Sequence, residues 1–494
     1  MPDLVVNTKY GAVRGVSIDN VVAFKGIPYA APPFGANRFK TPQPVVAWDG
    51  VRDTSNYGPT VIKPPYFPPF DSLFVEPQYP GEECLNLNIW TPDLGQARLP
   101  VYVWVHGGAF ANGSNAVPAY DGAKFARDGI VCVVINYRLG ADGFLFLDDG
   151  ISNLGILDQV TALRWVQENI RAFGGDPENV TIGGESAGSF SVTTLLSMPL
   201  TKGLFRRVIA QSGAGHHVLS TGTAKRVGGY LADKLGVAPT REAIAAVSFE
   251  KLVMAQARLS GEVFANPNPA VWGEVAGNVM PFEPVVDGDI IPARPIDGLF
   301  AGAGAGVDLL VGTNTEEYRL FMVPNNSIAY INDTFLSRAI MAYGLPLHET
   351  LFTYKEKRPE ASAGELLEAI ATDWFFRIPA IRLAEAQQNQ GGATYMYEFS
   401  WRSPEYDGRL GACHALEIAF AFDNLDKDNG RLGTGNPQHL ADSMHASWVS
   451  FITTGNPGWQ QYELDQRATM NFNLTNQLQF DPRWEERILW EGKR

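Results

Sequence analysis

The chain has 494 residues, of which 53 are acidic and 39 basic, and its formal net charge is −14. Nucleic acids and anionic membranes are bound by clustered Lys and Arg, so neither is expected as a partner of a chain this acidic. The hydrophobic content of 45% and the charged content of 19% are typical of a globular protein with a large core.

The cysteines and the absence of targeting patterns favour a cytoplasmic protein. The three cysteines, Cys84, Cys132 and Cys413, are too few and too odd in number for a disulfide framework, so we expect free thiols. Cys132 lies in the apolar run IVCVVIN, which predicts a buried strand. The first residues, MPDLVVNTKYGAVRG, show no basic-then-apolar leader pattern, and no run of 18 apolar residues predicts a membrane span.

Short apolar runs rich in β-branched residues alternate with helical patterns along the chain. Strands, several of them ending in a turn, are predicted within 99–108, 129–138, 179–184, 205–213, 307–314 and 394–401. Helices are predicted over 153–175 and 186–198, which are separated by one of these strands. Buried strands separated by helices indicate an α/β fold in which a mostly parallel sheet is covered on both faces.

No linker or repeat divides the chain, so we expect residues 1–494 to form a single domain. The stretches 57–82 and 260–300 are rich in Pro and Gly and are predicted to be irregular excursions from this core. Ligands of such sheets bind beyond the carboxyl ends of the strands. Four segments place polar or glycine residues there: HGGAF (106–110), GESAG (184–188), GTNTEE (312–317) and the loop before GACHALE (411–417).

Ser186 lies in a strand-turn-helix context that is typical of a nucleophile elbow. Gly184 and Gly188 flank it, because a side chain at either position would collide with the neighbouring strand or helix. The turn would expose the serine hydroxyl, and the N-terminus of the following helix would offer an unpaired N–H group to a developing oxyanion. With 50 glycines in the chain the pattern alone is weak, and the context makes it specific.

A serine needs a base to take its proton, and the chain has seven histidines. His414 suits the last place in the chain order Ser, acid, His, because a glycine-containing loop precedes it and a helix follows. The other histidines lie near strand ends, in a loop, or in an amphipathic helix where a surface or structural role is expected; they are His106, His216, His217, His348, His439 and His445. The residues alone leave the acid open, with Glu316 and Glu317 as candidates.

At this point the sequence resembles the type B carboxylesterase family, which includes bacterial para-nitrobenzyl esterases, fungal lipases and cholinesterases. The resemblance covers nearly the whole chain in eight ordered motifs. They are FKGIPYAAPPFGANRFKTPQP, EECLNLNIWTP, WVHGGAF, INYRLGADGFL, FGGDPENVTIGGESAG, GTNTEE, GACHALEIAFAF and TTGNPGWQQY. The resemblance implies an α/β-hydrolase fold, with a large mixed sheet and with loop and helix excursions that form an active-site gorge.

The resemblance also implies roles for individual residues. The family's triad carries over onto Ser186, Glu317 and His414, since Glu317 stands five residues after Gly312 as the family acid does. The oxyanion donors carry over onto the backbone N–H groups of Gly108, Ala109 and Ala187, and Glu185 and Ser212 are expected to support the triad. Aromatic residues of the segment 64–79 are expected to form a wall of the gorge, the alternative being a local core; they are Tyr66, Phe67, Phe70, Phe74 and Tyr79.

The chain departs from the family in three places. Tyr318 follows the triad glutamate where the family often has Gly, and Gly183 stands where an aromatic residue is common. Cys84 lacks the partner cysteine that many secreted members carry, which agrees with a cytoplasmic location. Two ion pairs of the family are expected here, Arg38–Glu82 and Arg138–Asp158.

These features predict a serine carboxylesterase that forms an acyl-enzyme and acts on neutral, mainly apolar esters of short to medium acyl chain. No metal or organic cofactor is expected. One alternative is a carbamate or amide hydrolase with the same triad, since the acyl chemistry is shared. The other is a non-catalytic binding protein on the same fold, against which an intact triad argues. The sequence does not decide between a monomer and a homodimer.

Overall fold

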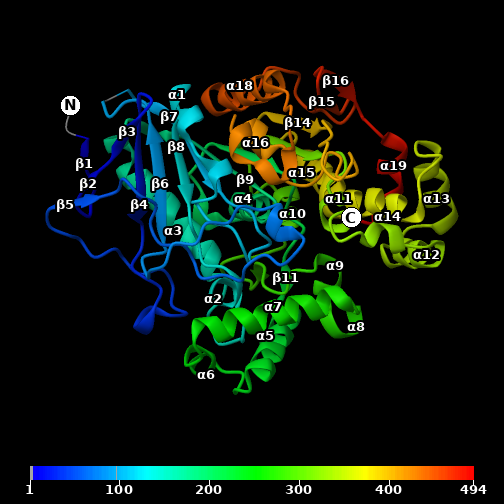
Figure 1. Ribbon diagram of the computed structural model, residues 1–494, viewed down its shortest axis with the longest axis horizontal. Helices are drawn as coiled ribbons and strands as arrows, with labels where there is room; N and C mark the ends of the chain where they lie inside the picture. The colour runs from blue at the N-terminus through cyan, green and yellow to red at the C-terminus, as the bar shows by residue number, and fades with distance from the viewer. Residues whose placement is uncertain (1–3, 96) are drawn as a thin grey trace. The chain divides into compact units, whose positions relative to one another are not determined.

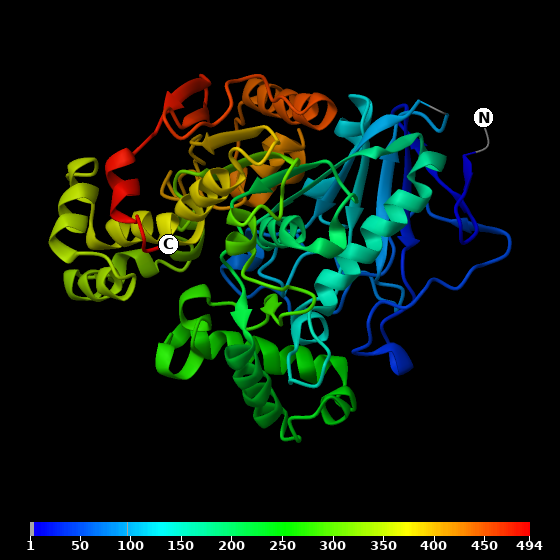
Figure 2. The same cartoon turned by 180° about the vertical axis from the view of Figure 1, so that it is seen from behind.

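The structure, a computed structural model, describes residues 4–95 and 97–494 (Figure 1, Figure 2). The N-terminal stretch in which no leader pattern is expected therefore has its first three residues outside the described part of the chain. The chain forms two compact units. The first contains residues up to 65, 76–209 and 215–304, and the second contains 66–75, 210–214 and 305–494. Within the described residues, no helix is long and apolar enough to cross a membrane.

The first unit is built on a mixed sheet. Its strands run in the order β3 (Val16–Ile18), β4 (Val21–Pro28), β6 (Asn86–Thr91), β8 (Val131–Ile135), β7 (Leu99–Val105) and β9 (Gly175–Glu185). β7 pairs in parallel with β8 and β9, whereas β6 pairs antiparallel with β8 and with β4. Every residue of β8 is buried, including Cys132, because the strand is covered on both faces. The predicted strands within 99–108, 129–138 and 179–184 are therefore confirmed.

Helices cover this sheet and extend from it. They are α1 (Ala123–Arg127), α2 (Gly140–Phe144), α3 (Leu154–Asn169), α4 (Ala187–Ser197), α5 (Thr221–Leu235), α6 (Arg241–Ala245), α7 (Phe249–Ala265), α8 (Pro269–Trp272), α9 (Val275–Asn278) and α10 (Pro295–Phe300). The predicted helices over 153–175 and 186–198 are confirmed as α3 and α4, which both pack against β9. α5 and α7 lie side by side in both views (Figure 1, Figure 2). The stretch 260–300 is less irregular than expected, since the end of α7 and all of α8, α9 and α10 fall within it.

Shorter strands complete the first unit. β1 (Val5–Asn7), β2 (Ala12–Arg14) and β5 (Val51–Asp53) form a three-stranded sheet, and β11 (Leu219–Ser220) pairs with β12 (Val285–Val286). β10 (Arg207–Gln211) begins in the first unit and ends in the second. Just before β10, the Arg206 N–H donates to the Val180 carbonyl in the first unit. Just after β10, the Ser212 N–H donates to the Gly312 carbonyl in the second unit.

The second unit continues the α/β pattern. Its strands run in the order β13 (Asp308–Asn314), β14 (Thr394–Phe399), β15 (Ala468–Phe472) and β16 (Gln477–Phe480), parallel except for the last pair. Its helices are α11 (Arg319–Met322), α12 (Asp333–Ala342), α13 (Leu347–Glu356), α14 (Ala363–Thr372), α15 (Ile378–Gln387), α16 (Ile418–Ala421), α17 (Asn429–Leu432), α18 (Gln438–Thr454) and α19 (Trp484–Leu489). β13 and β14 confirm the strands predicted over 307–314 and within 394–401.

Local sequence explains several helix boundaries. Ser362 and Glu365 form a reciprocal capping box at the start of α14. α5 begins after Ser220, whose hydroxyl accepts from Thr223 N, and ends at Gly236 in the left-handed conformation. These caps fix where each helix begins and ends.

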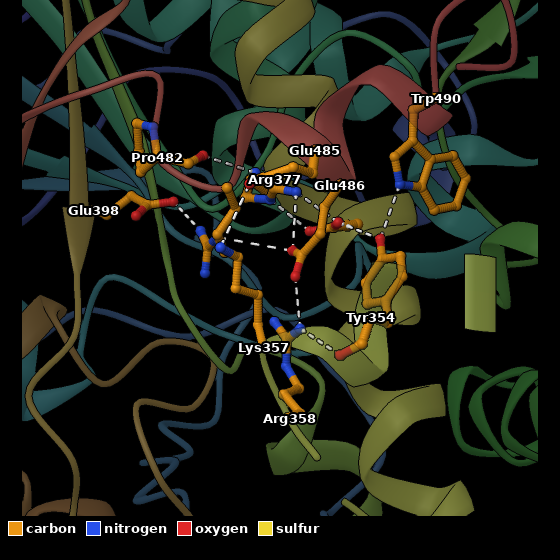
Figure 3. Close-up of polar contacts among 11 residues, drawn as sticks. Tyr354, Lys357, Arg358, Arg377, Glu398, Pro482, Glu485, Glu486 and Trp490 are labelled. Carbon is orange, nitrogen blue, oxygen red and sulfur yellow. Dashed lines mark hydrogen bonds and ion pairs between the residues drawn. The ribbon is translucent and has the colours of Figure 1, made fainter. Parts of the chain in front are cut away.

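Buried charges hold the C-terminal helix α19 in the second unit (Figure 3). Glu486 is 1% exposed and pairs with Arg358 over 2.6 Å and with Arg377 over 3.4 Å. Arg377 also pairs with Asp373 over 2.5 Å, and Trp490 donates to the hydroxyl of Tyr354. Each buried charge thus has an opposite charge beside it, which offsets part of its desolvation cost.

One predicted ion pair is confirmed and the other is wrong. Arg138 and Asp158 are both buried and lie 2.7 Å apart. Arg38 instead pairs with Asp142 over 3.2 Å and donates to the Ala245 and Val247 carbonyls. Glu82 is exposed, so pairing would add little stability there. The three cysteines are buried free thiols, as expected.

Candidate active site

Ser186 occupies the sharp turn between β9 and α4, in the first unit. Its φ is 56° and its ψ −123°, a conformation that a non-glycine residue adopts only when its surroundings impose it. A Cβ at Gly184 would lie 2.5 Å from the Gly188 carbonyl carbon, and one at Gly188 would collide with the Val105 carbonyl oxygen. The close approach of β7, β9 and α4 therefore requires both glycines.

The loop after β7 lies beside this turn. Three consecutive residues have positive φ: Gly108 at 110°, Ala109 at 53° and Phe110 at 57°. The backbone N–H groups of Ala111 and Asn112 both donate to the Gly108 carbonyl, at 2.9 and 2.8 Å, which closes the segment into a tight turn. We call residues 108–112 the oxyanion turn, because it carries two of the three predicted oxyanion donors.

Gly107 lies in the segment HGGAF, but the sequence did not indicate a separate role for it. A Cβ at this position would lie 2.9 Å from Glu185 Oε2 and 3.2 Å from Ser186 Cβ. The Glu185 carboxylate, the Ser186 side chain and the oxyanion turn thus meet at this glycine within the first unit. The HGG sequence before Ala109 was the available signal, since two adjacent glycines indicate a close backbone approach.

His106, at the start of this loop, is a buried neutral histidine. Its Nδ1 lies 2.8 Å from the Gly107 carbonyl oxygen, and its ring stacks on Tyr137 at 4.5 Å. Burial lowers the pKa of His106 to about 3. A Cβ at Gly113 would collide with this imidazole, so the ring limits which residue fits after the oxyanion turn.

Glu317 and His414 are joined in the second unit. Glu317 Oε2 lies 2.7 Å from His414 Nδ1, and both side chains are buried. The backbone N–H of His414 donates to the Glu317 carbonyl at 3.1 Å. Asn314 N donates to Glu317 Oε1 at 2.8 Å, so both carboxylate oxygens are hydrogen-bonded. This arrangement fixes the orientation of the imidazole.

Further side chains support this pair. Asn314 Nδ2 donates to the Cys413 carbonyl and to Glu417 Oε2, both at 2.7 Å. Burial, together with the nearby Glu317 charge, raises the pKa of Glu417. The rings of Phe376 and Phe321 lie 4.6 and 5.5 Å from the imidazole of His414, so apolar surface covers it.

Glu316 points to different partners from Glu317. Its carboxylate pairs with Arg402 over 2.5 Å and with Arg319 over 2.9 Å, and it accepts from Ala412 N at 3.0 Å. Of the two adjacent acids, only Glu317 is placed on the histidine. The Glu316 carboxylate thus connects the loop that precedes His414 to the turn after β13.

The two departures next to the site have packing explanations. A Cβ at Gly183 would lie 2.5 Å from the hydroxyl of Tyr102, so a neighbouring strand already supplies an aromatic ring there. Tyr318 packs its ring against Phe321 and Phe375, each at 5.2 Å, and its N–H donates to Thr372 Oγ1. The space beside the acid is thus filled by aromatic residues.

The remaining predicted site residues lie in both units. Ala187 is the first residue of α4, and Ser212 follows β10 with a φ of 50° and is buried. Tyr66 and Phe74 stack at 4.8 Å in the second unit, where Phe70 begins a single 3₁₀ turn. Phe67 is 56% exposed, and Tyr79, in the first unit, is 39% exposed. These aromatic side chains do not form a closed local core.

The chain resembles known esterases over its whole length. A model of the Carboxylesterase family matches residues 2–488. A para-nitrobenzyl esterase of Bacillus subtilis is 35% identical, over 99% of this chain and 98% of the relative, and a phenmedipham hydrolase of Pseudarthrobacter oxydans is 32% identical, over 94% of both. The crystal structure of a Geobacillus stearothermophilus carboxylesterase has a TM-score of 0.86 at 38% identity and covers 99% of this chain and 100% of its own.

These relatives share the fold as well as the sequence, which confirms the large mixed sheet of an α/β-hydrolase with helices on both faces. The relatives are named as esterases or hydrolases, and these names together with the family match support hydrolysis of carboxylic esters. The chain therefore belongs to the carboxylesterase family and is a carboxylic ester hydrolase.

Proposed function

We propose that Ser186, His414 and Glu317 are the nucleophile, the general base and the orienting acid of this hydrolase. The observation that carries the proposal is the strained Ser186 turn at the head of α4, because backbone strain of this kind costs stability and clusters at active sites. The buried Glu317–His414 pair supports it, because an imidazole held at Nδ1 by a carboxylate has the tautomer a general base requires.

The reaction proceeds through an acyl-enzyme. His414 takes the Ser186 proton as Oγ attacks the ester carbonyl, and the N–H groups of Gly108, Ala109 and Ala187 stabilise the resulting oxyanion. Ala187 contributes because the first N–H groups of a helix have no partner within it. The tetrahedral intermediate collapses, the C–O bond breaks and His414 protonates the departing alcohol. A water molecule then attacks the acyl-enzyme by the same route and releases the acid.

Glu185 and Ser212 support this machinery. The Glu185 carboxylate lies against Gly107, next to Ser186, and a negative charge there favours the imidazolium that forms during the reaction. Ser212 is buried after β10, and its N–H is fixed on the carbonyl of Gly312 in β13. We also infer a cytoplasmic location, which the three free thiols support.

The substrate is a neutral, mainly apolar ester of short to medium acyl chain. The segment 64–79 supplies partly exposed aromatic rings, with Tyr66 and Phe74 stacked, and these form a wall suited to apolar groups. Residues 57–84 contain no tryptophan, the ring that binds a quaternary ammonium most strongly. The name of the relative that acts on para-nitrobenzyl esters supports an apolar alcohol.

The test is kcat/KM for para-nitrophenyl butyrate against butyrylthiocholine, with a para-nitrophenyl carbamate and a butyryl anilide in the same assay. We expect the neutral ester to be preferred by at least about tenfold over the choline ester, which corresponds to about 1.4 kcal/mol of transition-state binding. Equal turnover of the two esters would contradict the neutral wall. Faster turnover of the carbamate or anilide would assign the triad to the alternative reaction.

A further inference from the structure

A buried ion pair closes the base of the aromatic segment. Lys63 and Glu76 flank residues 64–75, and Lys63 Nζ lies 3.0 Å from Glu76 Oε1. The Lys63 side chain has no exposed surface and that of Glu76 is 8% exposed. Both ends of the segment that carries Tyr66, Phe67, Phe70 and Phe74 are therefore fixed in the first unit.

The same ion pair is joined to the loop after β7. The N–H of Gly113 donates to Glu76 Oε2 at 3.1 Å, and Asn112 Nδ2 donates to the Pro64 carbonyl at 2.7 Å. One Glu76 oxygen thus receives the Lys63 charge and the other receives the N–H that directly follows the oxyanion turn. Two contacts, one from each end of segment 64–75, meet at residues 112 and 113.

The oxyanion turn needs such support. Its run of positive φ values, at Gly108, Ala109 and Phe110, costs free energy and persists only where the surrounding structure imposes it. The hydrogen bonds to the Gly108 carbonyl close the turn but do not attach it to the rest of the protein. Within the turn the Phe110 carbonyl accepts from the Gly140 N–H at 2.6 Å, and at its carboxyl-terminal end Asn112 and Gly113 attach it to Pro64 and Glu76.

Burying the Lys63–Glu76 pair costs desolvation free energy, which suggests that the charges have a role beyond closing the segment. Burial lowers the pKa of Lys63, and two apolar residues of similar volume would close the segment at lower cost. A carboxylate, however, accepts a hydrogen bond from a backbone N–H about twice as strongly as a neutral group does. Lys63 lies beside one oxygen of the Glu76 carboxylate, and the other oxygen holds the Gly113 N–H.

We propose that Lys63 and Glu76 are positioning residues, which attach the oxyanion turn to the base of the aromatic segment and so fix the N–H groups of Gly108 and Ala109. The proposal rests on the proposed function, which makes these groups the oxyanion donors. A displaced donor weakens binding of the transition state more than binding of the substrate. The pair therefore acts on kcat rather than on KM.

The experiment is a double-mutant cycle with Lys63→Met, Glu76→Gln and the combined variant, assayed on para-nitrophenyl butyrate per folded active site. Glu76→Gln keeps an oxygen for Gly113 and removes the charge, and we expect kcat to fall about tenfold with KM changed less than twofold. The combined variant leaves no unpaired charge, so its kcat is expected to exceed that of Lys63→Met alone. Its recovery also keeps the test valid if a single variant folds poorly.

Asp149→Asn is the matched control, because it removes the carboxylate of the partly buried Arg241–Asp149 pair, 2.7 Å apart, elsewhere in the first unit. It is expected to lower the free energy of unfolding and leave kcat unchanged. The positioning role would be overturned if the factors by which the two single variants lower kcat simply multiply in the combined variant. It would also be overturned if Glu76→Gln has the kcat of the wild type. Ser186→Ala in the same assay separates the two proposals, since its full activity would refute the proposed nucleophile whatever Glu76→Gln does.

Discussion

Glu317 and His414 are joined twice: the carboxylate Oε2 lies 2.7 Å from the imidazole Nδ1, and the backbone N–H of His414 donates to the Glu317 carbonyl. The second hydrogen bond fixes the two backbones relative to each other, so the ring has little freedom to leave the carboxylate. Because Glu316 carries its own arginine partners, the two adjacent acids have separate tasks.

Exchange of each acid for its amide distinguishes these tasks. Glu317→Gln is expected to lower kcat by about 10²- to 10⁴-fold, because the amide no longer stabilises the imidazolium or selects its tautomer. Glu316→Gln is the matched control, with an expected loss of stability of about 1 kcal/mol, because Arg319 keeps Glu368 as a partner and Arg402 is half exposed, and with a smaller loss of kcat. Steady-state kinetics and urea unfolding of both variants measure this. The reverse order of activities would place the acid at Glu316.

The elbow glycines should be intolerant of any side chain. Gly188→Ala is expected to destabilise the protein by several kcal/mol or to prevent folding, because its Cβ meets the Val105 carbonyl of β7. Gly229→Ala in α5 is the control, since nothing lies within 4 Å of its Cβ, and it is expected to stabilise by about 0.5–1 kcal/mol. Urea midpoints of the two variants give the comparison; equal midpoints would mean that the strands and α4 do not approach as described.

Glu368 predicts a pH dependence of stability. It is buried on α14, where burial raises its pKa from 4.5 to about 7 despite Arg319 at 3.8 Å; Glu316 and Arg358 are the other charges acting on it. The folded state therefore holds the proton more tightly than the unfolded chain, and its stabilising effect is complete below pH 4.5. It is lost as the pH rises to about 7, a decrease of about 3 kcal/mol.

The measurement is the free energy of unfolding of the wild type and of Glu368→Gln between pH 4.5 and 7.5. The difference between the two curves should slope across this window, because the amide does not titrate. A difference that is independent of pH would show that Arg319 keeps Glu368 ionised throughout.

The central strands and the turn at Ser186 could be predicted from the sequence because their signals are local. The apolar run around Cys132 and the glycines around Ser186 each indicate a structure that neighbouring residues determine. The choice between Glu316 and Glu317 was less accessible from the residues alone, since it depends on which way adjacent side chains leave a turn after β13. The family resemblance supplied that choice, and the contacts of Glu316 with two arginines give its physical reason.

Long-range pairing was harder to foresee. Arg38 was expected on Glu82, yet it lies against Asp142 and against the carbonyls of Ala245 and Val247 at the end of α6, because the helical stretch after residue 220 folds back to meet it. Lys63 and Glu76 gave no sequence signal at all, since a lysine and a glutamate at this separation are usually solvated surface residues. Their pairing depends on the fold of residues 64–75, which brings the two ends of this segment together.

The central claim, that Ser186 is the nucleophile, is tested most directly by labelling the protein with an organophosphate and locating the modified residue by mass spectrometry. We expect one equivalent of label on the peptide that contains Ser186, with loss of activity in proportion to labelling, and no label on Ser186→Ala. The same variant should retain the wild-type fold while kcat falls by about 10⁴- to 10⁶-fold. Stoichiometric label on any other serine, or an active Ser186→Ala enzyme, would contradict the account.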